Sequence, residues 1–263
     1  MTSRFPEGYF ARPTVARVQD HLDGGTDNYG PDRDFARDLV AAAPWLPASV
    51  RVNRAHGPRA LACLTREYGI DQVVDLGCGL PHDDNRHLPG EVRRMVYVDA
   101  DPGVEAHARM VLAERHGTAS LWADLEDMPA LLAAEPIAQF DRGRPIGVLL
   151  HDILPWLGDE TARTALTALR AWLPSGSVLS VTHATTDTAP EAMAALTDLY
   201  ARAGIGFRPR SWQQICDLLH AWTPLETDGP VTTASWRDPP RLHPHWDPSH
   251  AYAILASPGD RTS

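Results

Sequence analysis

The chain has 263 residues, 43% of them hydrophobic, and a formal net charge of −10. This length and apolar content predict one substantial core in a single α/β domain, and the acidic balance argues against a nucleic-acid partner. All 24 basic residues are arginines, which excludes chemistry that needs a P-loop lysine or a Schiff-base lysine.

Membrane and export signals are absent from the sequence pattern. No apolar stretch reaches the ~18–20 residues that a membrane span needs, and the first residues lack the apolar core of a signal peptide. The three cysteines, Cys63, Cys78 and Cys216, form no CxxC pair, which predicts reduced thiols. We therefore expect a cytoplasmic protein that does not bind a membrane.

The first part of the chain has helical patterning. Helices are predicted over residues 13–22, 31–42 and 49–68, separated by Gly24-Gly25 and Pro44. Residues 1–69 are therefore expected to form a helical extension. Its helices could cap the active site, exchange between the protomers of a homodimer, or do both.

From residue 70 onward, strands and helices alternate. A late-starting helix is expected after the first strand, and further helices are predicted from Pro102, over 159–172 and 189–203, and from a capping box at Ser211. The predicted strands cover residues 71–76, 95–99, 119–123, 146–150, 177–182, 231–236 and 251–256. This pattern predicts a doubly wound, seven-stranded Rossmann-like α/β sheet over residues 70–258, with the last two strands antiparallel. A Pro-rich surface loop at 238–248 and a frayed tail at 259–263 complete the chain.

Three consecutive predicted strands each end in an aspartate. Asp75 opens the turn Asp75-Leu76-Gly77-Cys78-Gly79, Asp99 ends the second strand, and Asp124 follows the third. Because the carboxyl ends of parallel strands meet at one edge of a sheet, this spacing predicts a nucleoside held across that edge. The plainer alternative is an ordinary strand-to-helix turn, with Asp99 and Asp124 serving as helix caps.

The glycine turn departs from the dinucleotide fingerprint. His82 stands where G-x-G-x-x-G/A needs a third small residue, and this argues against a pyrophosphate at the helix N-terminus. Asp75 suits a cofactor that carries an ammonium group. An NAD-dependent oxidoreductase is therefore the weaker alternative.

These motifs resemble those of the class I S-adenosylmethionine-dependent methyltransferases. More narrowly, the chain is similar to an actinobacterial family of methyltransferases whose substrates are mostly unassigned. The narrower resemblance rests on segment 16–29 with Gly24-Gly25-Thr26-Asp27-Asn28, on Asn53-Arg54, on Leu80-Pro81, on 97–102, on 180–185 and on Trp236-Arg237.

The resemblance implies S-adenosyl-L-methionine as the cofactor and gives each motif residue a role. Gly77 and Gly79 let the backbone approach the cofactor, Asp75 accepts from its amino group, and Asp99 binds the ribose hydroxyls. Asp124 accepts from the adenine amine and the Leu125 N–H binds a ring nitrogen. Cys78, Ala100 and His151 complete the predicted cofactor-binding set. Asp101 is expected to cap the next helix instead.

The acceptor side is predicted from residues that follow the fourth and fifth strands. His151 and Asp152 come directly after strand four, and a histidine there can act as a general base. His183 ends strand five, and Tyr29 from the extension could fold over the site as a lid. These three, His151, His183 and Tyr29, are the candidate catalytic residues. The narrower family often carries a Leu-His pair where this chain has Leu154-Pro155, so that histidine's role is lost or taken by His151.

No metal site is predicted, because the histidines of segment 243–250 lack helical spacing and accompanying Cys or Glu. The sequence thus predicts a methyltransferase that acts on a small molecule, with secondary metabolism as the expected setting. Two alternatives stay open: a binding protein that retains the nucleoside pocket without transfer, and intramolecular sulfonium chemistry that releases methylthioadenosine.

Overall fold

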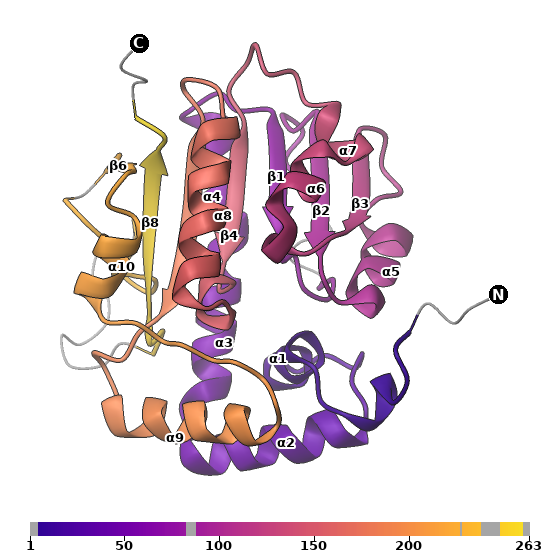
Figure 1. Ribbon diagram of the computed structural model, residues 1–263, viewed down its shortest axis with the longest axis vertical. Helices are drawn as coiled ribbons and strands as arrows, with labels where there is room; N and C mark the ends of the chain where they lie inside the picture. Colours follow the sequence, from indigo (N-terminus) through magenta and orange to yellow (C-terminus); the bar gives the residue numbers. More distant parts are fainter. Residues whose placement is uncertain (1–4, 83–87, 227, 238–247, 260–263) are drawn as a thin grey trace.

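The computed structural model describes residues 5–82, 88–226, 228–237 and 248–259. A mixed sheet runs through the molecule in the order β3-β2-β1-β4-β5-β8-β6 (Figure 1). Its parallel half consists of β1 (Gln72–Leu76), β2 (Arg94–Asp99), β3 (Thr118–Trp122), β4 (Gly147–His151) and β5 (Val178–Ala184). The strand order reverses between β1 and β4, and this reversal creates a crevice at the carboxyl ends of the two strands.

Antiparallel strands complete the sheet, as predicted. β8 (Ala251–Ser257) pairs with β5 over residues 251–256. Two short strands, β6 (Thr223–Pro224) and β7 (Val231–Thr232), pair with β8 in turn. The Rossmann-like α/β class is therefore confirmed, although the strand predicted over 231–236 is reduced to two residues and β6 was not predicted.

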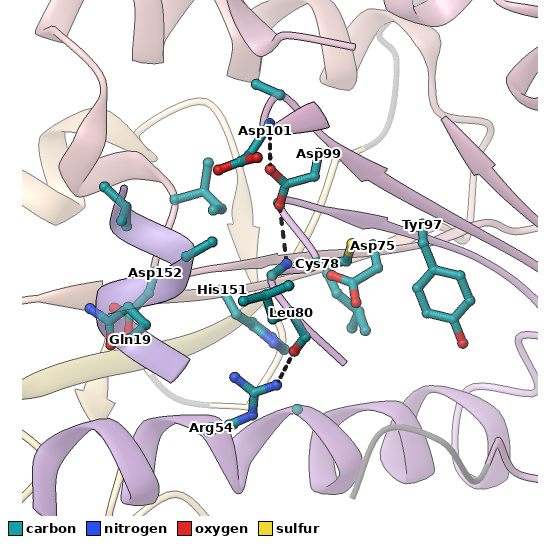
Figure 2. A pocket seen from close by; sticks show the side chains of 18 of the residues that line it. Gln19, Arg54, Asp75, Cys78, Leu80, Tyr97, Asp99, Asp101, His151 and Asp152 are labelled. Atoms are coloured by element: carbon teal, nitrogen blue, oxygen red, sulfur yellow. Dashed lines mark hydrogen bonds between the residues drawn. The ribbon is translucent and has the colours of Figure 1, made fainter. Parts of the chain in front are cut away.

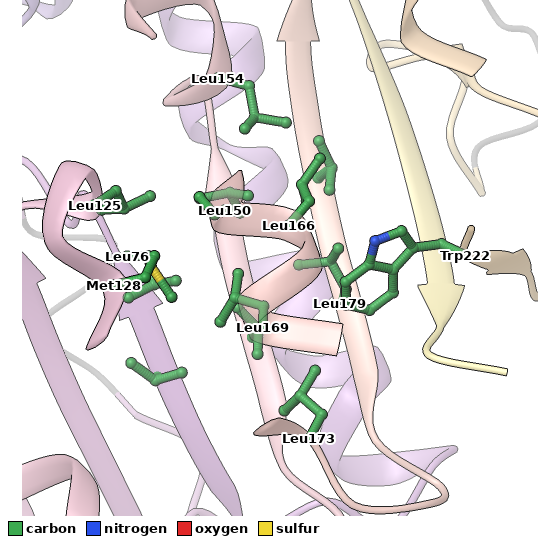
Figure 3. Packing of buried hydrophobic residues seen from close by; sticks show 14 of the residues in the cluster. Leu76, Leu125, Met128, Leu150, Leu154, Leu166, Leu169, Leu173, Leu179 and Trp222 are labelled. Carbon is green, nitrogen blue, oxygen red and sulfur yellow. The ribbon is translucent and has the colours of Figure 1, made fainter. Parts of the chain in front are cut away.

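Helices cover both faces of the sheet. On one face, α6 (Met128–Ala133), α8 (Asp159–Trp172) and α10 (Trp212–Leu218) bury leucines such as Leu166 and Leu169 against Leu150 and Leu179 (Figure 3). On the other face, α4 (His56–Arg66) and α5 (Pro102–Val111) pack against Val73, Met95 and Leu149. The alternation of strand side chains assigns neighbouring residues to the two faces.

The N-terminal helices lie across the carboxyl ends of the parallel strands (Figure 1). These elements are η1 (Tyr9–Ala11), α1 (Val15–Asp23), α2 (Gly30–Ala42) and α3 (Leu46–Arg54). α1, α2 and α3 form a third apolar cluster together with α9 (Pro190–Arg202), and this cluster includes Val18, Leu39 and Tyr200. We call α1, α2, α3 and α9 the cap. α4 belongs to the sheet layer instead, so the predicted extension over 1–69 contributes to two parts of the fold.

Several predicted helices differ from the structure. The helix predicted over 49–68 is wrong as a single element, because it divides into α3 and α4 at Ala55. Pro58 has no N–H to donate to the carbonyl of Arg54, and this loss breaks the helical ladder. The described residues between β1 and β2 contain no helix, and residues 83–87 lie outside the described part of the chain.

The segment between β3 and β4 holds helices that the sequence pattern did not predict: η2 (Leu125–Asp127), α6 and α7 (Glu135–Ala138). Asp127 caps α6 by accepting from Ala130 N. A short helix, η3 (Leu154–Trp156), also follows β4. Most of the Pro-rich loop and of the 243–250 histidine segment, and the last four residues of the tail, lie outside the described residues. No helix in the described ranges is long and apolar enough to cross a membrane.

Candidate functional site

A cavity of about 630 Å³ opens at the carboxyl ends of β1, β2 and β4. This volume lies within the ~300–1,000 Å³ that small-molecule sites usually occupy. The sheet contributes the glycine turn and the aspartates near the strand ends, while η1, α1, α3 and α4 contribute the opposite wall. Figure 2 shows Gln19 of α1 and Asp152 on one side of the cavity and Tyr97 of β2 on the other.

The glycine turn has two glycines with different requirements. Gly77 has φ +76°, and a Cβ there would lie 2.0 Å from Cδ1 of Ile153. Gly79 has φ +65°, and no atom lies within 4 Å of the position of its Cβ. Gly77 therefore has a packed neighbour, whereas Gly79 leaves open space beside a cavity that both of them line.

Asp99 is held at the end of β2 by backbone donors. Its carboxylate accepts from Gly79 N at 3.1 Å and from Asp101 N at 2.9 Å (Figure 2). Burial raises the pKa of Asp99 to about 6, although these backbone bonds oppose the shift. Ala100 follows it in the cavity wall. The positions of Asp99 and Ala100 are compatible with the cofactor-binding role predicted for them.

Asp75 lines the same cavity on β1. Burial raises its pKa to about 7, the charge of Asp99 adds to the shift, and Arg54 opposes it. Cys78 also lines the cavity, and burial raises the pKa of its thiol far above the usual range. Two neighbouring buried carboxyl groups make this part of the cavity suited to a ligand that brings positive charge and hydrogen-bond donors.

Asp124 serves as a helix cap and also faces the cavity. Its side chain accepts from Glu126 N at 2.9 Å at the start of η2, so the capping alternative is seen in the structure. Leu125 is buried beside it, and both residues line the cavity. Asp101 caps α5 by accepting from Gly103 N at 2.8 Å, as predicted, and it also accepts from the hydroxyl of Tyr9.

His151 lies in the cavity wall at the end of β4. Its Nε2 lies 2.8 Å from Oγ of Ser180, and its ring packs edge-on against His56, with 5.0 Å between the centroids. Burial lowers the pKa of His151 to about 4. The imidazole is therefore neutral near pH 7 and has the protonation state that a general base requires.

The structure places the other two candidate catalytic residues away from this cavity. His183 is fully buried, with Nδ1 2.8 Å from the carbonyl oxygen of Ala184 and Nε2 accepting from Arg210 at 2.8 Å. Thr182, its neighbour on β5, lines the cavity instead. Tyr29 is 46% exposed at the N-terminus of α2, and its ring packs against Phe10 at 5.1 Å.

The glycine-rich segment of the extension positions a cluster of polar side chains that joins the cap to the glycine turn. Asp23 pairs with Arg54 at 3.2 Å and with His82 at 3.4 Å, and Arg54 donates to the carbonyl oxygen of Leu80. His82 also lies 3.6 Å from Asp20. The motif residues of this cluster were recognised in the sequence, but their mutual contacts were not.

Asp20 explains the neighbouring glycine. A Cβ on Gly25 would lie 2.1 Å from a carboxylate oxygen of Asp20, so a larger residue there would displace this buried carboxylate. Asn28 donates to the same carboxylate at 2.8 Å and to the carbonyl oxygen of Gly25 at 3.0 Å. The glycine-rich segment is thus a tight turn around one buried carboxylate.

Comparisons with known proteins agree on one family. The family described as S-adenosyl methyltransferase matches residues 9–257. A crystal structure of a DUF574 family protein from Streptomyces avermitilis is 27% identical, with a TM-score of 0.86 over 94% of this chain and 98% of the other. A crystal structure of a candidate methyltransferase from Thermobifida fusca is 30% identical, with a TM-score of 0.86 over 97% of this chain and 99% of the other.

More distant structures share the fold alone. Magnesium protoporphyrin IX methyltransferase from Synechocystis, with S-adenosylhomocysteine bound, is 14% identical. Its TM-score is 0.51 over 91% of this chain and 97% of its own. None of the curated proteins matches the chain.

Proposed function

Because the chain belongs to the S-adenosyl methyltransferase family, we propose that it transfers the methyl group of S-adenosylmethionine to a small molecule in the cytoplasm. The family predicted from the sequence is confirmed, and S-adenosylmethionine is its cofactor. The observation that carries the proposal is the 630 Å³ cavity that joins the glycine turn and Asp99 to His151. Three free cysteines support a reducing compartment.

The cofactor side of the cavity has the groups that this ligand needs. The sulfonium supplies an activated methyl group when the cofactor is bound. In this proposal Asp99 accepts from the ribose hydroxyls and Asp75 accepts from the amino group, and the position of both carboxyl groups in the cavity wall supports these roles. Gly79 leaves room for the ligand to approach the backbone. Asp124 and the backbone at Leu125 would bind the adenine.

The acceptor side supports a small molecule because the cap covers it. α1 places Val15, Ala16 and Gln19 in the cavity wall, so a large acceptor would have to displace this helix. Neutral His151 is available to receive a proton. Holding a nucleophile in line with the methyl group supplies much of the rate acceleration without further help from the protein.

One observation favours the alternative, a protein that binds the cofactor without transfer. The Leu154-Pro155 pair, which is buried, stands where the family resemblance implies Leu-His, so this position offers no imidazole to accept a proton. We regard transfer as the better supported function, because His151 lies in the cavity wall and can take that role.

The test is calorimetric titration of S-adenosylhomocysteine into the wild type, Asp99→Ala and the control Asp34→Ala, an exposed acid on α2. A charge-assisted contact is worth about 1.5–3 kcal/mol, so we expect Asp99→Ala to weaken binding roughly ten- to hundredfold. No binding to the folded wild type would overturn the cofactor site. Product analysis then separates S-adenosylhomocysteine, methylthioadenosine and no turnover, which correspond to methyl transfer, intramolecular chemistry and binding alone.

A further inference from the structure

A second, smaller cavity adjoins the main one beneath the cap. It has a volume of about 40 Å³. Five residues line both cavities and therefore mark the place where they meet: Gln19, Val50, Asn53, Asp152 and Trp156. We call this place the junction. None of its residues has a role in the proposed cofactor site.

Two buried oxygen atoms at the junction have no hydrogen-bond partner among the described residues: Oδ1 of Asp152 and Oδ1 of Asn53. The Asn53 amide is oriented by donating to the carbonyl oxygen of Ser249 at 2.9 Å and to Oγ of Ser49 at 3.3 Å. These acceptors require the NH₂ group, so the oxygen of Asn53 is left for another donor.

Asp152 is held firmly in an uncommon conformation. Its φ is +55°, and its backbone N–H donates to the carbonyl oxygen of Thr182 at 3.1 Å and to Oγ1 at 2.9 Å. An unsatisfied buried acceptor is unfavourable, and strained backbone of this kind is found most often at functional sites. Oδ1 of Asp152 and Oδ1 of Asn53 are therefore two acceptors that suit a ligand with more than one hydrogen-bond donor.

The charges around the junction select a cation. Among the described residues that line the main cavity, Arg54 is the single arginine. It forms an ion pair with Asp23 and donates to the carbonyl oxygen of Leu80. The smaller cavity is walled by aromatic side chains: Trp45, Trp156, Tyr200 and Phe207. The Trp156 ring lies 5.1 Å from Tyr200 and 4.7 Å from Phe207. A carboxylate beside aromatic faces attracts an ammonium group.

We propose that the junction binds the amino group of the methyl acceptor and that the protein is an N-methyltransferase of small primary or secondary amines. This inference rests on the proposed function and names its substrate class. An ammonium group has enough donors for both unpartnered oxygens, whereas a carboxylate and an ether have none. An alcohol has one donor and no charge to offset that of Asp152.

In the proposed transfer step, the junction supplies the group that takes up the proton of the ammonium. The ammonium gives one proton to the Asp152 carboxylate and becomes a neutral amine. Its nitrogen lone pair forms the new N–C bond as the S–C bond breaks, and the electrons of that bond stay on sulfur, leaving a neutral thioether. The product leaves as a methylated ammonium, and Asp152 returns its proton to solvent. Burial raises the pKa of Asp152 to about 6, which brings it closer to that of a useful base.

The experiment is calorimetric titration of three probe amines, benzylamine, 2-phenylethylamine and tryptamine, into the full chain saturated with S-adenosylhomocysteine. The uncharged comparison ligand is 2-phenylethanol. The variants are Asp152→Asn and the control Asp34→Asn. Asparagine tolerates positive φ, so Asp152→Asn should keep the fold, and its melting temperature is measured beside the wild type.

We expect at least one amine to bind the wild type and Asp34→Asn about tenfold or more tightly than the alcohol. Asp152→Asn should lose that preference and keep its affinity for S-adenosylhomocysteine. Methyl transfer to the bound amine should give an N-methyl product.

Three results would overturn the proposal: no amine binds, the alcohol binds as well as the amines, or Asp152→Asn weakens S-adenosylhomocysteine instead of the amine. Failure of the proposed function is distinct. In that case S-adenosylhomocysteine does not bind, and the amine titrations are repeated without it, so that amine binding at Asp152 is still decided.

Discussion

The two halves of the cavity are built in different ways. The cofactor half consists of strand ends and backbone: Gly79 N donates to Asp99, and Asp101 N holds the same carboxylate. The acceptor half is assembled from the cap, where α3 supplies Asn53 and a turn after β4 supplies Asp152. One half is fixed by the register of the sheet, while the other depends on how the cap packs onto it. Mutations should therefore affect the two halves separately.

The largest effect is expected from the buried ion pair that supports the cap. Arg17 donates to Asp32 at 2.8 Å, and both side chains are almost completely buried. Breaking such a pair by removing one partner costs about 3–5 kcal/mol, because a buried charge is left alone. Arg17→Met should therefore destabilise α1 and α2 in denaturant unfolding and hydrogen exchange. Fast exchange in β1 and β2 as well would show that the cap and sheet unfold as one unit.

The second comparison lies within the cofactor half. Gly77→Ala should cost roughly 2–5 kcal/mol, since it combines unfavourable φ with a collision against Ile153. Gly79→Ala should cost about 1 kcal/mol, because only its φ is unfavourable. Thermal melting measures both, and calorimetry should show that Gly79→Ala still weakens S-adenosylhomocysteine. Equal losses of stability would contradict the packing difference between the two glycines.

The same contrast explains what could be predicted from the sequence. The cofactor half is local: each aspartate lies at or just beyond the end of its own strand, so hydrophobic runs and glycines were enough to predict that these residues share one edge of the sheet. The Ser211–Gln214 capping box of α10 and the N-capping of α5 by Asp101 were also predicted correctly, because both depend on residues two or three positions apart.

The acceptor half depends on long-range packing that no local pattern records. His183 was expected at the cavity because it ends β5, yet side chains alternate along a strand, and Thr182 faces the cavity instead. Asn53 of α3 and Asp152 after β4 are far apart in the sequence and line one cavity only in the folded chain. The lid role predicted for Tyr29 stays a prediction: the residue is exposed at the start of α2 and is not among the described residues that line the cavity.

A smaller effect, dependent on pH, is expected at Asp75. Burial first and the charge of Asp99 second raise its pKa to about 7, whereas an unfolded aspartate titrates near ~3.9. A raised folded pKa gives stability that is complete below the unfolded pKa and is lost as the pH rises through the folded one. Asp75→Asn should therefore stabilise the ligand-free protein little at pH 4 and increasingly up to pH 8.

The melting temperatures of Asp75→Asn and the wild type, measured across this pH range, test the prediction. Each kcal/mol of stability shifts the melting temperature by roughly 2–4 °C. The difference between the two proteins is the useful quantity, because buried His56, His151 and His183 have lowered pKa values and contribute the opposite dependence. With S-adenosylhomocysteine present, the wild type should become more stable than Asp75→Asn, since the amino group of the ligand binds the Asp75 carboxylate. A gain in stability that is the same at pH 4 and pH 8 would contradict the raised pKa.

The smallest effect on stability is expected where the two halves meet. Asp23 connects α1 to Arg54 and His82, and it is 9% exposed, whereas the Asp34–Arg37 pair lies within α2 with both side chains about 70% exposed. Asp34→Asn should change stability by about 0.3 kcal/mol and Asp23→Asn by about 1 kcal/mol. The two variants should differ more in their affinity for S-adenosylhomocysteine than in stability, because Arg54, the partner of Asp23, donates to the carbonyl oxygen of Leu80 beside Gly79. Calorimetry should therefore show weaker S-adenosylhomocysteine binding for Asp23→Asn and unchanged binding for Asp34→Asn. Equal affinities would mean that the cap holds its position on the glycine turn through apolar packing alone.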